Sequence, residues 1–234
     1  MKISIITLFP EVFDPILNSS ILKRAQKKGK VIFEFINLRD FGEGKHQVVD
    51  ARPYGGGPGM ILRADILAKA LSSIVDRQSL TKNEKRKTIL TSASGKPYKQ
   101  AKAQKLSKLD HLIIVCGHYE GVDQRFIDLY VDEEISIGDF VLTGGEIPAM
   151  MITDSIVRLI PGVLEKEEAI INESFTKNLL EEPQYTRPER FEGIKVPEVL
   201  LSGHHKKVEE WRKKEALKKT KKIRPDLLRI IQKG

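Results

Sequence analysis

The sequence contains a single cysteine, Cys116, among 234 residues. No disulfide can therefore form within the chain, and we expect a reducing, cytoplasmic setting. No stretch approaches the ~20 consecutive apolar residues that a membrane-spanning helix needs, so we expect no membrane partner. The first residues, MKISIITLFPEVF, have too short an apolar run for a secretory signal, and we interpret them as a strand.

Patterns typical of metal sites are also missing. The histidines show no zinc-ligand spacing, so the sequence predicts no metal site of that kind; they are His46, His111, His118, His204 and His205. Cys116 ends the apolar run HLIIVC, and we interpret it as a core residue rather than a nucleophile.

Positive charge is in excess, and it lies at one end of the chain. The formal net charge is +8. Residues 202–234 hold twelve Lys or Arg and four acidic residues, so 12 − 4 = +8, and the first 201 residues are formally neutral. A basic segment of this kind favours a polyanionic partner, because phosphate contacts release counterions. Nucleic acid fits better than an anionic membrane surface, since the segment has no broad apolar stripe. A solvated lysine-rich tail is the alternative.

Apolar patterns alternate between strand and helix along the first two thirds of the chain. This alternation predicts an α/β domain with a mainly parallel sheet. The predicted strands are 3–9, 31–38, 87–95, 111–117 and a short strand within 134–146, and the predicted helices are 11–28, 64–76, 99–109 and 148–160.

The composition changes after Gly162. Residues 165–186 are acidic and polar, and from about residue 187 the chain is basic and helical. We therefore expect a folded α/β domain over 1–162, a linker over 163–186 and a small helical domain over 187–234 that binds nucleic acid.

A glycine-rich segment, YGGGPGM (54–60), can follow backbone paths closed to other residues and approach a ligand closely. It is not a P-loop, because no Lys-Ser/Thr pair follows at the required offset. It is not a dinucleotide fingerprint either, because Met60 stands in place of the third glycine. Phosphate or nucleotide binding and a plain flexible loop both remain open.

Three further small-residue loops follow predicted strands: 92–95 (SASG), 117–121 (GHYEG) and 137–146 (IGDFVLTGGE). In parallel α/β sheets, ligands bind at the carboxyl ends of the strands. We therefore expect the three loops to converge on one pocket, although each alone is compatible with an ordinary turn.

Asp154 and Arg158 lie four residues apart on a predicted helix, the spacing of a surface ion pair. The linker acids Glu173, Glu181 and Glu182 are compatible by composition with solvated carboxylates. These residues alone therefore indicate no chemistry.

Several longer motifs occur in one order with near-fixed spacing over essentially the whole chain. They are SIITLFPEVF, HQVVDARPYGGGPGM, VCGHYEGVDQR, SIGDFVLTGGEIPAM, RLIPGVL, ESF, YTRPE and VPEVLLSGHH. In this combination the chain resembles bacterial tRNA (guanine-N1-)-methyltransferases, the TrmD family.

The resemblance implies a SPOUT-type parallel-sheet domain with a C-terminal trefoil knot, followed by a small helical domain. It implies methyl transfer from S-adenosylmethionine to ring nitrogen 1 of the guanosine at position 37 of tRNA, next to the anticodon. It also implies a homodimer with its active site at the subunit interface. Magnesium is associated with the family, and the sequence indicates no site for it.

The matched motifs imply which residues of this chain correspond to the site residues of the family. Arg158 matches an arginine assigned to the target guanine, and Glu173 stands where the family has an aspartate proposed as general base. His118 and Ala93 replace an arginine and a proline of better-known members. The residues expected to contact the cofactor are Ser92, Gly95, Gly117, Tyr119, Glu120, Ile137, Gly138, Asp139, Phe140, Val141, Leu142, Gly144, Gly145 and Pro148.

Three alternatives stay open on the sequence. A non-catalytic RNA-binding module explains the basic segment but not the glycine loops. A nucleotide-using phosphotransfer enzyme lacks the lysine that the glycine loop needs. Another knotted RNA methyltransferase, acting on a ribose hydroxyl or on ribosomal RNA, leaves the linker and tail motifs unexplained.

Overall fold

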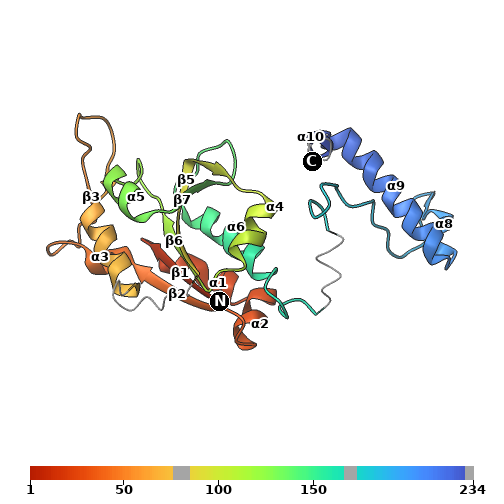
Figure 1. Ribbon diagram of the computed structural model, residues 1–234, viewed down its shortest axis with the longest axis horizontal. Helices are drawn as coiled ribbons and strands as arrows, with labels where there is room; N and C mark the ends of the chain where they lie inside the picture. The colour runs from red at the N-terminus through yellow and green to blue at the C-terminus, as the bar shows by residue number, and fades with distance from the viewer. Residues whose placement is uncertain (76–84, 166–172, 230–234) are drawn as a thin grey trace. The chain divides into compact units, whose positions relative to one another are not determined.

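A five-stranded parallel sheet organises the first part of the chain. The computed structural model describes residues 1–75, 85–165 and 173–229, and the chain divides into two compact units, Met1–Glu165 and Lys166–Gly234. In the first unit the strand order is β2-β1-β6-β5-β7, and all neighbours run parallel (Figure 1). The strands are β1 (Lys2–Thr7), β2 (Ile32–Asn37), β5 (Arg86–Pro97), β6 (His111–Cys116) and β7 (Glu133–Ser136). The predicted α/β class with a parallel sheet is confirmed.

Helices cover both faces of this sheet. The helices are α1 (Asp14–Leu17), α2 (Ser20–Lys27), α3 (Ala64–Ile74), α4 (Gln100–Leu106), α5 (Gln124–Tyr130) and α6 (Glu146–Val157). Short 3₁₀ turns η1 (Pro10–Phe13) and η2 (Leu38–Phe41) and a two-stranded pair, β3 (Asp50–Ala51) with β4 (Ile61–Leu62), complete the unit. No helix in the described ranges is long and apolar enough to cross a membrane.

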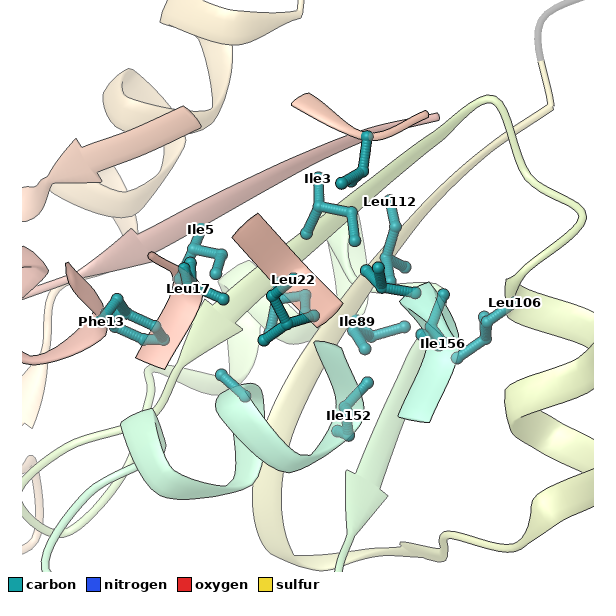
Figure 2. Close-up of a cluster of buried hydrophobic side chains, with 14 of the residues drawn as sticks. Ile3, Ile5, Phe13, Leu17, Leu22, Ile89, Leu106, Leu112, Ile152 and Ile156 are labelled. Atoms are coloured by element: carbon teal, nitrogen blue, oxygen red, sulfur yellow. The ribbon is translucent and has the colours of Figure 1, made fainter. Parts of the chain in front are cut away.

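Two apolar clusters follow from the two-residue period of the buried strands. On one face, Ile3, Leu112 and Ile89 meet the helical side chains Leu22 and Ile152, as Figure 2 shows. The intervening strand residues point to the other face and pack against α3 and α5; the buried members there include Ile6, Leu90, Ile113, Val115, Ile66, Leu67, Ala70 and Phe126. All six residues of β6 are buried, as its run of apolar residues predicted.

The predicted helix over 11–28 is wrong in extent. The segment forms η1, α1 and α2 instead of one helix. Pro15 has no amide hydrogen to donate to a helix hydrogen bond, and Ser20 takes a left-handed conformation with φ 42°. No continuous ladder of hydrogen bonds can therefore run through the segment.

Two other local features differ from the prediction. Helix α5 was not predicted; it begins where the Asp123 side chain accepts a hydrogen bond from the Arg125 amide at 3.0 Å. The segment 92–95, expected as a loop after a strand, is an irregularity inside β5, because the register with β7 shifts between Thr91 and Lys96. The predicted helix over 64–76 ends at Ile74, and its last position lies outside the described residues.

The second unit contains a short hairpin and helices. The hairpin joins β8 (Arg190–Phe191) to β9 (Ile194–Lys195) through Glu192 and Gly193, both with positive φ, as tight hairpin turns require. The helices are α8 (Glu198–Leu201), α9 (His205–Ile223) and α10 (Asp226–Arg229). Parts of the expected linker and of the expected C-terminal domain, residues 166–172 and 230–234, lie outside the described residues.

A buried carboxylate ties α4 to the edge of the sheet. The Glu133 side chain on β7 is 6% exposed, and its oxygens lie 2.5 Å and 2.8 Å from Nζ of Lys102. Nζ of Lys87 lies 2.8 Å from Oε2 of Glu133. Burial raises the pKa of the Glu133 carboxyl, but the two ammonium groups more than offset this and hold its pKa below the usual value.

We expect Glu133→Gln to lower the free energy of unfolding at neutral pH by roughly 1–3 kcal/mol, because both ammonium groups lose a charged acceptor. A lowered carboxyl pKa contributes stability above the ordinary pKa, and this contribution disappears as the pH falls through the folded-state value. The deficit of the variant should therefore shrink in acid. Urea unfolding at about pH 7 and about pH 3 measures it. The exposed Glu11→Gln is the control, and an equal deficit at both pH values contradicts the assignment.

Candidate functional site

A cavity of about 470 Å³ opens beside the irregular middle of β5 and the carboxyl ends of β6 and β7. Its walls come from three segments: residues 90–94, residues 117–122 and residues 134–145. The structure thus brings the three small-residue segments together, as parallel strand ends predict.

Most of the residues expected at the cofactor lie in this cavity. Gly95 and Asp139 do not line it: Gly95 faces the backbone of β7, where an added Cβ would lie 2.5 Å from the Ile135 nitrogen, and Asp139 is exposed. Twelve of the fourteen expected residues do line it: Ser92, Gly117, Tyr119, Glu120, Ile137, Gly138, Phe140, Val141, Leu142, Gly144, Gly145 and Pro148. Their roles in binding stay predictions.

The buried hydroxyl of Thr91 lies where the three segments meet. Its oxygen is 3.2 Å from the carbonyl oxygens of both Val115 and Gly145. The Gly117 amide lies 3.4 Å from the same hydroxyl, and the Gly145 amide donates to the Gly117 carbonyl at 2.7 Å. Thr91 was not predicted as a site residue, although it directly precedes the segment SASG.

Glycine is required at two positions of this junction. A Cβ at Gly145 would collide with the Thr91 hydroxyl and lie 2.6 Å from the Gly117 nitrogen. A Cβ at Gly117 would lie 2.9 Å from the Thr91 carbonyl oxygen. The close approach of the segments therefore depends on the absence of side chains there.

His118 and Glu146 form a buried polar corner beside the cavity. His118 lines the cavity, and its Nδ1 is buried without a hydrogen-bond partner among the described residues. This nitrogen lies 3.9 Å from Oε2 of Glu146, whose Oε1 accepts from the Thr7 hydroxyl at 2.8 Å. Glu146 is the first residue of α6, where the helix dipole favours a carboxylate. The sequence analysis assigned Glu146 and Thr7 no role.

Cys116 behaves as a core residue. It is 3% exposed, and burial, reinforced by the charge of Glu146, raises the pKa of its thiol well above the usual value. The thiol stays protonated at neutral pH and is a poor nucleophile. The structure therefore supports the interpretation from the sequence.

The glycine-rich segment 54–60 lies at the rim of the cavity without lining it. Gly59 has φ 79°, and a Cβ there would collide with the side chain of Glu120, which does line the cavity. The Glu120 amide donates to the Met60 carbonyl at 3.0 Å. Tyr54 is 97% exposed. The segment therefore supports Glu120 from outside.

Arg158 stands at the far end of α6 from the cavity. It caps the helix C-terminus, and its amide donates to the Asp154 carbonyl at 3.2 Å. Pro148, which lines the cavity, is ten residues earlier, or roughly 15 Å along the helix. Arg158 does not line the cavity of its own chain.

Glu173 belongs to the second unit and lines a cavity there of about 460 Å³, against α9. The linker acids Glu181 and Glu182 line the same cavity, and Glu182 lies 3.3 Å from Nε of Arg212. The other lining residues with ionisable side chains, apart from Arg212, are Lys177, His205, Glu209 and Lys213. The structure thus groups the three linker acids beside a basic helix.

No metal site accompanies these cavities within residues 1–75, 85–165 and 173–229. No group of three or more His, Cys, Asp or Glu side chains there is placed to hold a metal ion. No chemical step below depends on a magnesium ion.

Comparison with known proteins gives a match over nearly the whole chain. The family model described as tRNA (Guanine-1)-methyltransferase TrmD matches residues 1–230. A protein of Bacillus pumilus named tRNA (guanine-N(1)-)-methyltransferase is 53% identical over 97% of this chain and 92% of its own length. Proteins of the same name from Bacillus subtilis (51% identical; 98% of this chain, 93% of its own length) and Carboxydothermus hydrogenoformans (52%; 98% and 88%) are similar in the same way.

We expect Gly145→Ala to lower the free energy of unfolding by roughly 1–3 kcal/mol, because the added Cβ collides at the junction around Thr91. The backbone at Gly145 (φ −84°, ψ −1°) accepts alanine. The loss of stability therefore measures the steric clash of the added Cβ and not strain in the backbone. Ala93→Ser, which adds one atom at an exposed position of the same cavity, is the control. Urea unfolding compares them, and equal stabilities contradict a tightly packed junction.

Proposed function

Because the chain belongs to the TrmD family of tRNA (guanine-1)-methyltransferases, we propose that it transfers a methyl group from S-adenosylmethionine to N1 of guanosine 37 of tRNA, next to the anticodon. The observation that carries the proposal is the cavity built from three small-residue segments around Thr91, in a chain whose whole length matches a methyltransferase family. We further propose that it acts in the cytoplasm, where its substrate tRNA is found.

The cavity fits S-adenosylmethionine in size and chemistry. Its volume of about 470 Å³ lies within the ~300–1,000 Å³ common for ligand pockets. The hydroxyls of Ser92 and Thr143 in the lining can bind a polar ligand, and Leu142 and Phe140 offer apolar surface. When bound there, the cofactor supplies a methyl group already activated by its sulfonium.

The SPOUT-type trefoil knot is part of the proposal. Supporting it, the segment after β7 returns to the end of β6, where His118 pairs with Gly144 and the Gly145 amide reaches Gly117. Folds in which the chain is threaded through a knot are rare. The same segment would hold the cofactor.

The basic second unit is proposed to bind the tRNA. Most cationic side chains of α9 are exposed, and a helix of this charge attracts RNA phosphates through counterion release. We keep the three-part division, 1–162 for the cofactor, 163–186 as linker and 187–234 for tRNA, as a proposal, with residues 173–182 of the linker packed against α9. The target base has to leave its stack to reach a buried methyl donor.

Glu173 and Arg158 are proposed as the catalytic residues. Guanine N1 carries a proton at neutral pH and is therefore a poor nucleophile. A carboxylate at Glu173 accepts that proton, and the guanidinium of Arg158 stabilises the negative charge that gathers on the exocyclic oxygen. Glutamate has one more methylene than aspartate, and this gives Glu173 a longer reach.

A homodimer with a shared active site is also proposed. Ile147 and Met151 on α6 are 53% and 52% exposed, and Val12 and Ile16 on the neighbouring η1 and α1 are 40% and 41% exposed. A second copy covering these apolar side chains removes them from water. Because Arg158 lies roughly 15 Å along α6 from the cavity of its own chain, the Arg158 that acts there belongs to the second copy.

The function is tested with unmodified tRNA transcripts and methyl-labelled S-adenosylmethionine. We expect label in 1-methylguanosine after nuclease digestion, and none when guanosine 37 is replaced by adenosine. Label in a ribose-methylated nucleoside, or undiminished label on the adenosine transcript, contradicts the proposal and favours another RNA methyltransferase. Absence of both cofactor binding and label favours a non-catalytic RNA-binding module.

Replacing either catalytic residue should lower turnover. We expect Glu173→Gln and Arg158→Ala each to reduce kcat by roughly 10²–10⁴-fold, because each removes a group that acts on the transferred proton or the developing charge. The dissociation constant for S-adenosylmethionine, measured by calorimetry, should stay unchanged. Glu189→Gln, an exposed acid of the same unit, is the control. Normal turnover by Glu173→Gln moves the role of base to another acid, with Glu181 or Asp154 the next candidate.

Mixing two inactive proteins tests the shared site. Ala93→Trp blocks the cavity of one subunit, and Arg158→Ala removes the guanidinium of the other. After subunit exchange, mixed dimers hold one site with an open cavity and an intact arginine from the second copy, so activity should return. If activity does not return although mass spectrometry confirms subunit exchange, Arg158 and the cavity of one site belong to the same subunit.

A further inference from the structure

The segment that carries Glu173 is folded into a compact loop. The Phe175 amide donates to the Leu179 carbonyl at 2.7 Å, and the Glu181 amide donates to the Ser174 hydroxyl at 3.0 Å. The Thr176 amide reaches the Glu173 carbonyl at 3.3 Å. These bonds fix the course of residues 173–181 locally. They do not by themselves fix where the loop lies on α9.

The hydroxyl of Thr220 joins this loop to α9. Thr220 is 0% exposed. Its Oγ1 donates to the Ala216 carbonyl within the helix at 2.7 Å and accepts the Leu180 amide of the loop at 2.9 Å. The single hydroxyl proton is directed at Ala216, so the oxygen lone pair is oriented toward the loop. The donor and acceptor capacities of this hydroxyl are thereby both used.

Two other contacts between loop and helix are more exposed. Arg212 lies 3.3 Å from Glu182, with its side chain 56% exposed. The Arg224 guanidinium lies 5.9 Å from the centre of the Phe175 ring. Exposed ion pairs and cation–π contacts stabilise weakly, whereas leaving a part-buried amide such as that of Leu180 without its acceptor costs more. Thr220, itself fully buried, is therefore the best-shielded of these three contacts.

We propose that Thr220 is a positioning residue for the methyl transfer: its hydroxyl fixes the loop that carries Glu173 on the tRNA-binding helix. This inference rests on the proposed role of Glu173. Thr220 touches neither cofactor nor base; it holds the carboxylate at one place relative to α9. Since misplacing a reacting group by about 1 Å can cost 10²-fold in rate, one hydrogen bond at this point suffices to matter.

The test compares Thr220→Val, which keeps the shape and removes the hydroxyl, with Thr220→Ser, which keeps the hydroxyl. We expect Thr220→Val to lower kcat at least about tenfold through misplacement of Glu173, with unchanged KM for tRNA and unchanged cofactor affinity. Thr220→Ser should restore kcat. Thr153→Val, at a buried threonine whose hydroxyl has no partner among the described residues, is the control and should leave kcat unchanged.

A merely structural role of Thr220 predicts a different pattern. In that case Thr220→Val has a lower melting temperature but an unchanged kcat below that temperature, and this outcome overturns the inference. So does equal kcat for the valine and serine variants. If Thr220→Val does not fold, hydrogen exchange of the Leu180 amide in the unmodified protein decides: protection matching that of the α9 amides supports the inference, and fast exchange overturns it.

A double variant separates this inference from the proposed function. If Thr220 acts through Glu173, adding Thr220→Val to Glu173→Gln lowers kcat no further. If Glu173→Gln is inactive while Thr220→Val is fully active, only the role of Thr220 is wrong. If Glu173→Gln is fully active, the proposed base is wrong, and any loss in Thr220→Val then comes from another part of the loop.

Discussion

The close approach of three backbone segments around the Thr91 hydroxyl is the constraint on which the cavity depends. Parallel pairing of β5 with β6 and with β7 brings their carboxyl ends together, but it leaves no room for side chains where the segments cross. Glycine at 117 and 145 removes that obstacle, and the backbone groups there bond to one another and to the Thr91 hydroxyl. The junction behind the cavity is therefore fixed by hydrogen bonds of the protein itself.

The fold class was predictable because its information is local and redundant. The run HLIIVC is apolar on both faces, and only a strand buried in a parallel sheet needs that pattern. The interrupted helix over 11–28 was not predictable from periodicity, since its breaks depend on backbone conformation at Ser20. Helix α5 was missed because it spans seven residues with one buried side chain, Phe126, and the Asp123 cap was its only clear signal.

The candidate site was predictable in part for a related reason. Glycine clusters after strands identified the three segments, and most of the residues carried over by resemblance line the cavity they form. Thr91 and Glu146 were missed, because a threonine inside a strand and a glutamate at a helix start are common for structural reasons alone. Arg158 and Glu173 carry no local signal, and only the resemblance of the surrounding motifs suggests the roles proposed for them.

The loop with Glu173 folds against α9, so the proposed base and the proposed RNA-binding helix belong to one body. If α9 binds RNA phosphates as proposed, any movement of the helix carries the carboxylate with it. In a separate, flexible linker the base would have to be ordered anew in each catalytic cycle, at a cost in conformational entropy. A base built onto the unit proposed to bind RNA avoids that cost, because the fold of this unit already orders the carboxylate relative to α9.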